Sequence, residues 1–418
     1  MDFVTITAWI IWILTFLLCI HIAYFTTVSL FFLKRIPRVP PHSPVHRFAA
    51  IIAARNERDV IGNLVESLKA QNYPKELFDI IVVPNNCADD TKTAAEQAGA
   101  AIVECPHKVH SKGDVLTFIF NYLLNNNDGY DAFCVFDADN VVHKDFLYEM
   151  NKAYCNGSRV AQGYRDSKNP ADTFISACYS IYYWGVNRFY NHTRSALDMS
   201  VMINGSGFMI AAETLRKIGG WRTYTMTEDL EFTAQCALRG IKIDWVSGAI
   251  IYDEQPTTFL QSWVQRKRWS TGIIQGCEMY SWKLFRKFLK NKNICCLDMS
   301  LFFLSPLITV IFAAVSLLSM ILNIAYILIF IFPDITYATV FEKMFISFNF
   351  SYVAAMALSL LVIILEHKKI SRVGKGVLGY WIFITSWIPI NLICLFKRVQ
   401  TWEEIKHSRN IKISEIEV

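Results

Sequence analysis

Charged side chains are scarce in this sequence, and one long stretch has none. Asp, Glu, Lys and Arg make up 18% of the 418 residues, against 53% for hydrophobic residues. Between Phe3 and Leu33 there is no Asp, Glu, Lys or Arg, and a helix needs roughly 20 apolar residues to cross a bilayer core. No basic region precedes this stretch and no small-residue cleavage site follows it, which argues against a secretory signal. We therefore expect a membrane anchor within residues 1–45.

Other absences narrow the class of protein further. The eleven cysteines include no Cys-x-x-Cys pair, so we expect reduced, buried thiols. No internal repeat, low-complexity tract or long proline-rich linker interrupts the middle of the chain, which predicts one water-facing catalytic unit. The net charge of +5 is explained by basic clusters beside the apolar stretches. It therefore gives no reason to expect nucleic-acid binding.

Three further apolar stretches lie near the C-terminus, at Leu297 to Phe332, Phe345 to Leu365 and Val377 to Phe396. Basic residues flank the apolar stretches at Lys34, Arg35, Arg38, Lys283, Arg286, Lys287, Lys290, Lys292, Lys368, Lys369, Arg372 and Lys375. By the positive-inside rule these clusters predict that the globular middle part of the chain is cytosolic. We expect a multi-pass protein of the plasma membrane. With three C-terminal spans, however, the basic tail with Lys397, Arg398 and Lys406 would lie outside. Either the stretch from Leu297 divides in two, or the segment around Pro389 is re-entrant.

The chain accordingly divides into five parts. We expect the anchor over 1–45, a cytosolic catalytic domain over 46–257, amphipathic interface helices over 258–293, a membrane region over 294–398 and a tail over 399–418. The interface segment mixes aromatic residues with Arg and Lys just before a span, which is typical of helices lying at the level of the lipid headgroups.

Short apolar runs alternate with amphipathic segments in the catalytic domain. The expected strands are Phe48 to Ala54, Phe78 to Val83, Ala100 to Cys105 and Ala132 to Phe136. The expected helices are Asp59 to Ala70, Asp90 to Gln97 and Val115 to Leu124. This alternation predicts an α/β fold with a mainly parallel sheet and helices on both faces. Ligands bind such sheets at the carboxyl ends of the strands, where Arg55-Asn56-Glu57, Asn85-Asn86-Cys87 and Asp137-Ala138-Asp139 follow their strands.

Asp137 and Asp139 end the fourth expected strand with one residue between them. In extended backbone both carboxylates project to the same side. Paired oxygens can hold Mg²⁺ or Mn²⁺, and the metal in turn neutralises a diphosphate leaving group. Acidic pairs at strand ends are also common turn formers, so this motif needs support from its context.

Thr227-Glu228-Asp229 opens an expected helix that runs through Leu238 to Gly240, with Thr227 as its N-cap. The helix dipole favours an ionised carboxylate in the first turn, which suits a base that takes a proton from a sugar hydroxyl. The alternative is that these residues only cap the helix.

Gln265, Arg268 and Trp269 lie at i, i+3 and i+4, on one face of a helix. Arg can pair with phosphate oxygens and Trp can stack on a pyranose, so the three fit a site where a donor diphosphate meets an acceptor sugar. Trp269 could equally be a membrane-interface aromatic. We expect Arg266 and Lys267 to face the headgroups.

The order of these motifs resembles that of a known family. The series Asn56-Glu57, Asp89, Asp137-Ala138-Asp139, Thr227-Glu228-Asp229 and Gln265-Arg266-Lys267-Arg268-Trp269 is similar to the D, DxD, TED, QxxRW pattern of processive family 2 glycosyltransferases. These include cellulose, hyaluronan, poly-N-acetylglucosamine and mixed-linkage β-glucan synthases. The resemblance covers the whole chain, because those enzymes also place a GT-A catalytic domain between membrane helices.

The resemblance implies an inverting transfer from a UDP-sugar to a growing polysaccharide. It implies Asp229 as the base within Thr227-Glu228-Asp229, and Asp137 and Asp139 as ligands of Mg²⁺ or Mn²⁺. It places Ala54, Glu57, Asn85, Lys112, Asp137 and Arg268 against the donor. It places Gln265, Trp269, Gly205, Ser206 and Trp221 against the acceptor.

Two departures from the family pattern bear on specificity and regulation. Asn85 stands where many relatives have an aspartate for the uracil NH, and its amide oxygen can still accept that bond without a charge. The chain has neither an FxVTxK segment nor the C-terminal domain that binds cyclic di-GMP in cellulose synthases, so regulation by that nucleotide is not expected.

Three functions stay open from the sequence. Processive polymerisation is favoured, with UDP-glucose ahead of UDP-N-acetylglucosamine as donor. A single transfer that makes a glycolipid is the second enzymatic interpretation. A noncatalytic membrane subunit is the third.

Overall fold

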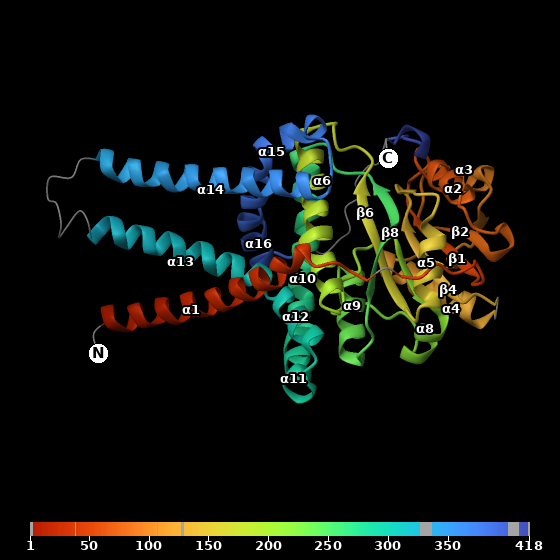
Figure 1. Cartoon of the computed structure of the whole chain (residues 1–418), viewed down its shortest axis with the longest axis horizontal. Helices are drawn as coiled ribbons and strands as arrows, with labels where there is room; N and C mark the ends of the chain where they lie inside the picture. The colour runs from red at the N-terminus through yellow and green to blue at the C-terminus, as the bar shows by residue number, and fades with distance from the viewer. Residues whose placement is uncertain are drawn as a thin grey trace.

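The computed structural model describes residues 3–37, 39–106, 108–126, 129–326, 337–399 and 409–416. It consists of a unit built on one sheet and a group of long helices that project away from it (Figure 1). Arg38 and Lys406 of the basic clusters, and the last residues of the apolar stretch that ends at Phe332, lie outside the described residues.

The strands of the described residues form a single sheet in the order β3-β2-β1-β4-β7-β6-β8-β5. Their bounds are β1 (Phe48–Ala54), β2 (Phe78–Pro84), β3 (Ala101–Ile102), β4 (Ala132–Asp137), β5 (Val141–Val142), β6 (Val160–Ser167), β7 (Phe208–Ala211) and β8 (Asp244–Asp253). β1 pairs in parallel with both β2 and β4, while β7 runs antiparallel to β4 and β6. The predicted mainly parallel α/β fold is confirmed.

The third expected strand is much shorter than Ala100 to Cys105. β3 pairs only with Ile81 and Val82 of β2, at the edge of the sheet. An edge strand has one partner, so its pairing ends where the register with β2 ends. The other expected strands begin where β1, β2 and β4 begin.

Helices cover both faces of the sheet. α2 (Ile61–Lys69), α3 (Thr91–Ala98) and α5 (Phe146–Cys155) pack on one face, and α4 (Lys112–Asn125), α8 (Ala212–Ile218) and α9 (Glu228–Arg239) pack on the other. β1 sends Ala50 and Ile52 into the first core and Ala49 and Ile51 into the second. Burial on both faces explains why its sequence is a continuous apolar run.

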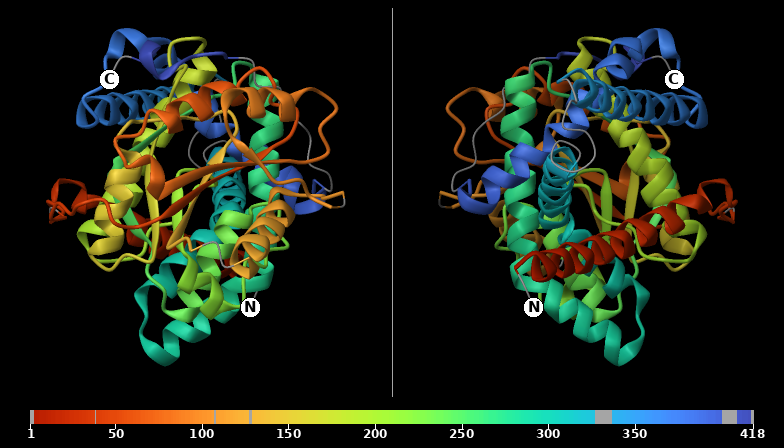
Figure 2. Two further views of the ribbon diagram at one scale, coloured as in Figure 1. Left: turned by 90° about the vertical axis from the view of Figure 1, so that its right-hand side faces the viewer. Right: turned by 90° about the vertical axis from the view of Figure 1, so that its left-hand side faces the viewer.

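A second group of helices runs across the direction of the projecting helices (Figures 1 and 2). It contains α6 (Phe174–Gly185), its π-helical continuation η3 (Val186–His192), α7 (Thr193–Ala196), α10 (Phe259–Gly276), π-helical η4 (Cys277–Ser281), α11 (Trp282–Asn291) and α12 (Ile294–Phe303). Thr258 begins α10 with a capping box to Gln261. These helices lie between the sheet and the projecting helices.

The projecting helices are α1 (Phe3–Ser29), α13 (Ser305–Tyr326) and α14 (Tyr337–Leu365), and α15 (Ile370–Thr385) and α16 (Trp387–Phe396) follow them in the chain. Short 3₁₀ turns lie at η1 (Leu30–Leu33), η2 (Lys75–Leu77) and η6 (Ile413–Glu415). By length and composition, Ile11–Leu33, Met344–Leu365 and Ile370–Phe396 can each cross a membrane. The pair Ile294–Phe303 and Ser305–Leu318, bent by 54°, is a fourth candidate. The stretch from Leu297 is therefore bent, and the pair counts as one broken span or as a re-entrant loop, not as two spans.

A buried ion pair joins two helices of this second group, and a hydrogen bond ties it to the projecting helix α1. Arg194 of α7 donates from Nε and Nη2 to the two carboxylate oxygens of Asp298 in α12, at 2.8 Å each. Tyr24 of α1 donates to Asp298 Oδ1 at 2.9 Å. The side chains of the pair are 1% and 4% exposed. The Asp298 carboxylate therefore links α12 to α1 and α7, which are distant from it in the sequence.

Candidate active site

Asp137 lies at the carboxyl end of β4, where two loops hold its backbone and side chain. Its backbone N–H donates to Ser206 Oγ at 3.0 Å. Its carboxylate forms an ion pair with the ammonium of Lys112, the first residue of α4. Lys112 also donates to the carbonyl oxygen of Gly205 at 2.6 Å. Lys112 therefore joins α4, β4 and the Gly205 loop at one point.

Asp139 lies on the same edge and is 5% exposed. Its carbonyl oxygen accepts from Lys168 Nζ at 2.9 Å, and Lys168 pairs with Glu254 at 3.0 Å. The side chains of that pair are 1% and 7% exposed. Lys168 and Glu254, which follow β6 and β8, were not predicted from the sequence. No motif marks them, because the sheet topology alone brings those strand ends to the edge that carries Asp139.

Thr227 precedes α9 at the predicted N-cap position, but the predicted side-chain cap is absent. Its Oγ1 is buried and has no hydrogen-bond partner in the described structure. The loop before α9 is held instead by Glu231, whose Oε2 accepts from the backbone N–H of Tyr224 and Thr225 at 2.7 Å each. Met226 N–H donates to Gln275 Oε1 of α10 at 2.9 Å. These bonds fix the position of Glu228 and Asp229, in the first turn of α9, relative to α10.

Glu228 and Asp229 are both held in a low-dielectric environment. Burial, aided by the charge of Glu228, raises the pKa of Asp229 to about 7, and Lys112 opposes the shift. Burial also raises the pKa of Glu228, again against the charge of Lys112. A carboxylate whose pKa lies near neutrality is matched to taking a proton from a hydroxyl at physiological pH.

α10 approaches α9 closely because residue 272 is glycine. A Cβ built on Gly272 would lie 2.8 Å from Cβ of Thr227, so no larger residue fits without displacement. One turn earlier, the guanidinium of Arg268 lies in the field of Glu228, Asp137 and Asp229, while burial lowers the pKa of Arg268. Charged residues of three elements therefore form one electrostatic cluster: Glu228 and Asp229 in the first turn of α9 (the acidic turn), Asp137 at the end of β4, and Arg268 of the Gln265-Arg268-Trp269 motif in α10 (the α10 motif).

Gln265 and Trp269, the other two members of the α10 motif, are both partly enclosed by neighbouring side chains. Gln265 Oε1 is buried without a hydrogen-bond partner in the described structure. Trp269 packs edge-on against Tyr179 at 6.0 Å and Tyr183 at 6.3 Å, and is stacked with Trp387 at 6.4 Å between ring centroids. Trp269 thus lies among helices α6, α10 and α16.

Arg266 does not face the headgroups as expected. It is 0% exposed and donates from Nη1 to Phe383 O at 2.8 Å and to Ser386 Oγ at 2.7 Å. The reason is that α10 is covered by the α15–α16 junction, a neighbour 117 to 120 residues away in the chain.

The residues expected to contact the donor base lie together at the ends of β1 and β2. Asn85 Nδ2 donates to Ala54 O at 2.9 Å, and its Oδ1 accepts from Arg55 Nε at 3.1 Å. Glu57 N–H donates to Thr91 Oγ1 at 2.8 Å, and Asp89 accepts from Thr91 N–H at 3.1 Å.

Comparison with known proteins places this site in a family. Residues 46–272 match the model described as "Glycosyltransferase like family 2". The chain belongs to glycosyltransferase-like family 2. The matched segment begins two residues before β1 and ends at Gly272, so it contains every motif residue described above.

Three curated relatives of this family 2 chain are similar over part of their length. A beta-monoglucosyldiacylglycerol synthase of Synechocystis is 26% identical over 64% of this chain and 56% of its own length. The probable glycosyltransferase YdaM of Bacillus subtilis is 26% identical over 63% and 61%. A poly-beta-1,6-N-acetyl-D-glucosamine synthase of Staphylococcus aureus is 24% identical over 53% and 53%. The chain therefore spans little more than half the length of these relatives.

A solved structure shares the fold. The mannosyltransferase PcManGT of Pyrobaculum calidifontis, in complex with GDP-Man and Mn²⁺, superposes with a TM-score of 0.56 at 16% identity. The superposition covers 91% of this chain and 99% of that chain. The likeness supports the GT-A-like arrangement of the family 2 domain.

Two residues expected at the acceptor, Trp221 and Ser206, are buried in the family 2 domain. Trp221 is 1% exposed, stacks on Phe232 at 4.3 Å and donates to Thr223 Oγ1 at 3.0 Å. Ser206 is 0% exposed and bonds to Asn140 and to the backbone of Asp137. Both side chains are therefore enclosed, and their assignment to the acceptor remains a prediction. A Cβ on Gly205 would lie 3.5 Å from Asp229 Oδ2, so this loop does border the acidic turn.

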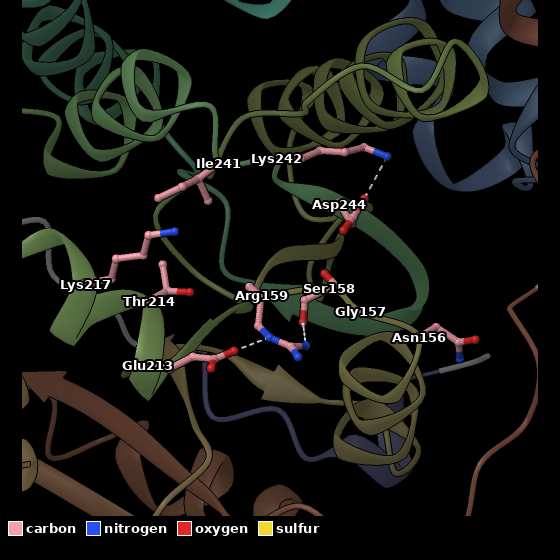
Figure 3. A pocket seen from close by; sticks show the side chains of 10 residues that line it. All are labelled: Asn156, Gly157, Ser158, Arg159, Glu213, Thr214, Lys217, Ile241, Lys242 and Asp244. Atoms are coloured by element: carbon pink, nitrogen blue, oxygen red, sulfur yellow. Dashed lines mark hydrogen bonds and ion pairs between the residues drawn. The ribbon is translucent and has the colours of Figure 1, made fainter.

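A pocket of about 560 Å³ lies elsewhere on the family 2 domain (Figure 3). It is lined by Asn156, Gly157, Ser158, Arg159, Glu213, Thr214, Lys217, Ile241, Lys242 and Asp244. Asp244 begins β8, and Val160 begins β6 beside Arg159. β6 runs in the same direction as β4, since both are antiparallel to β7. The pocket therefore lies at the amino ends of the strands, on the edge opposite Asp137.

Proposed function

We propose that this chain transfers a sugar from a UDP-sugar to the hydroxyl of a lipid acceptor, with inversion at the anomeric carbon. The donor would lie at the carboxyl ends of β1, β2 and β4, between Asn85 and Asp137. The acceptor would enter from the bilayer past Trp269. The single observation that supports chemistry at this point is the buried Asp229 with its pKa near 7, beside Lys112 and Arg268.

In the proposed reaction, Asp229 removes the proton from the acceptor hydroxyl as the hydroxyl oxygen attacks the anomeric carbon. The bond between that carbon and the diphosphate oxygen breaks, and UDP leaves with the electron pair. Lys112 and Arg268 offset the negative charge that develops on the diphosphate. Gln265 would hold the acceptor through its otherwise unpartnered Oε1.

The donor set at the strand end fits a divalent cation. Carboxylate oxygens suit Mg²⁺ and Mn²⁺, which keep further positions for water and substrate phosphates. Asp137 and Asp139 would supply two such ligands, and Lys112 would give up or share its contact with Asp137. When bound, the cation neutralises the diphosphate leaving group. Among the described residues no group of three or more His, Cys, Asp and Glu side chains could hold it without substrate.

The surface of the projecting helices favours a lipid acceptor over a polymer. In α14 the closely spaced residues Met344, Phe345, Ile346, Phe348 and Phe350 are 47% to 77% exposed. At 100° per residue these positions surround the helix. An apolar helix exposed on all sides faces lipid rather than the wall of a polar channel. A soluble polysaccharide would need such a channel, whereas a glycolipid product stays in the membrane.

Processive polymerisation remains the second candidate. The α10 motif and the similarity to a poly-N-acetylglucosamine synthase favour it. The similarity to a glucosyldiacylglycerol synthase favours UDP-glucose and diacylglycerol as the first substrates to test.

Product analysis separates the candidates. We would incubate the purified protein, in vesicles containing diacylglycerol, with radiolabelled UDP-glucose or UDP-N-acetylglucosamine and Mg²⁺ or Mn²⁺. A lipid acceptor predicts one labelled product that extracts into organic solvent and carries a single sugar. A ladder of water-soluble, glycanase-sensitive products would overturn the proposal in favour of polymerisation. Undiminished product formation by Asp229→Asn would contradict catalysis at this site altogether.

A further inference from the structure

The pair α15–α16 is long and apolar enough to cross a membrane, yet one of its ends is bonded to the sheet and the other to the helix layer beside the sheet. Before α15, Lys368 Nζ donates to Asp166 Oδ2 of β6 at 2.6 Å. After α16, Arg398 Nη1 donates to Glu278 Oε2 of η4 at 2.9 Å. A helix that crosses a bilayer carries its two ends to opposite sides. Here the end before α15 is bonded to β6, and the end after α16 is bonded to η4 in the helix layer beside the sheet. Neither end lies at the far end of the projecting helices.

The direction of the pair agrees with these contacts. α15 and α16 run across α1, α13 and α14 and not alongside them (Figures 1 and 2). α15 packs on α6, and α16 packs on α10. The pair therefore belongs to the layer of helices between the sheet and the projecting helices.

α15 has two apolar faces with different neighbours. Val373, Gly376, Val377, Tyr380 and Phe383 form the buried face against α6. The close contact needs glycine, because a Cβ on Gly376 would lie 2.6 Å from Ala177 Cβ. On the other side, Ile370, Leu378 and Ile382 are 49% to 58% exposed. An exposed apolar stripe beside the projecting helices is a surface that a helix lying in the bilayer interface would present to lipid.

A side chain of α10 holds the break between α15 and α16. Arg266 of α10 donates to Phe383 O, a backbone carbonyl at the interruption of the helix, and to Ser386 Oγ, which itself donates to Phe383 O. The guanidinium also lies 4.5 Å from the ring centre of Phe383. A buried arginine with this role fixes the junction to the helix that carries Gln265 and Trp269.

We propose that α15–α16 lies along the surface of the bilayer, in the leaflet on the catalytic side, and does not cross it. In this arrangement, lipid covers the exposed apolar stripe of Ile370, Leu378 and Ile382. Lys375 near the start and Lys397 at the end of the pair then face the same headgroup layer, as the positive-inside rule requires of both. The inference does not depend on which acceptor the enzyme uses.

The last described segment supports the same topology. Arg409 Nε pairs with Asp172 at 2.8 Å, and Asn63 Nδ2 of α2 donates to Asn410 Oδ1 at 2.7 Å. This segment therefore lies on the catalytic unit, on the same side as the end of α14. In the described residues the crossings are then α1, α13 and α14. The re-entrant alternative for the segment around Pro389 is the one that this geometry favours.

Accessibility in sealed vesicles tests the side of the C-terminus. A protease-cleavable epitope would follow Val418 through a flexible spacer, and a second epitope would lie between α13 and α14. In sealed inverted vesicles we expect the protease to remove the C-terminal epitope and spare the second. If the C-terminal epitope is protected there and cleaved from outside intact cells, α15–α16 crosses the bilayer and the proposal is overturned.

Depth measurements test the orientation of the pair directly. Spin labels would be attached to a ketone-bearing residue introduced by codon suppression, which leaves the eleven native cysteines in place. Labels at Leu378 and Phe396, 58% and 85% exposed, should report the same shallow depth. Labels at Phe350 and Ile364 of α14, 77% and 68% exposed, provide the matched control and should report different depths. A depth difference between Leu378 and Phe396 as large as that in α14 would refute the in-plane arrangement.

Discussion

Gly272 of α10 packs directly against Thr227, the residue that precedes the acidic turn of α9. A Cβ at position 272 would lie 2.8 Å from Thr227 Cβ, closer than real Cβ contacts allow. The position of Arg268 relative to Asp229 therefore depends on the absence of one methyl group.

We expect Gly272→Ala to separate α10 from α9 and lower kcat by tenfold or more, while costing about 1–3 kcal/mol in stability. Initial rates and thermal unfolding in detergent would measure both. Gly62→Ala is the matched control, because a Cβ on Gly62 of α2 meets nothing within 4 Å. Equal activities of the two variants would show that the contact is unimportant.

The raised pKa of Asp229 predicts a pH dependence of activity. The base must be ionised, so kcat/KM should rise with pH with a midpoint near 7. Asp229→Asn should lower the rate by about 10²–10⁴-fold. A rate that stays flat from pH 5 to 9 would exclude Asp229 as the base.

The same shift predicts a pH dependence of stability. The folded state holds the Asp229 proton up to about pH 7, whereas the unfolded state releases it near the ordinary value of 3.8. The folded state therefore binds more protons between these values, and this contribution to stability falls as pH rises through the window. Asp229→Asn should accordingly unfold at a higher temperature than the unsubstituted protein at pH 8, and the gain should vanish at pH 4.

Lys112 lowers the pKa of both Glu228 and Asp229. We expect Lys112→Met to move the midpoint of the kcat/KM profile above 7, in addition to any loss of donor affinity. Lys112→Arg keeps the charge and should leave the midpoint near that of the unsubstituted enzyme. An unshifted midpoint in Lys112→Met would mean that the ammonium does not act on the base.

Breaking the buried Arg194–Asp298 pair should be costly. Asp298→Leu leaves the Arg194 charge without its partner and should cost about 3–5 kcal/mol, measured by thermal unfolding. The double variant Arg194→Met with Asp298→Leu removes both charges and should recover most of the loss. A double variant as unstable as the single one would show that the two side chains contribute independently.

Local sequence patterns predicted much of the fold and the order of the site. β1, β2 and β4 are continuous apolar runs, and the polar residues that follow them do meet at one edge. Lys168 and Glu254 could not be found this way, because their positions depend on the pairing of β6 with β8. The burial of Arg266, Ser206 and Trp221, which was not predicted, has a common cause. Each side chain is polar or amphipathic, and only the three-dimensional packing determines whether it is enclosed by distant elements.

Lys168 bonds to Asp139 and to Arg409 through one ammonium. The buried Lys168 ammonium thus bonds to the carbonyl oxygens of Asp139 and Arg409, which are more than two hundred residues apart. A preparation clipped ahead of Arg409 would lose one of these bonds at the edge that carries Asp139. Such material would keep its sheet and its helices but differ in catalytic constants, so the integrity of the extreme C-terminus should be verified by mass before rates are compared between batches.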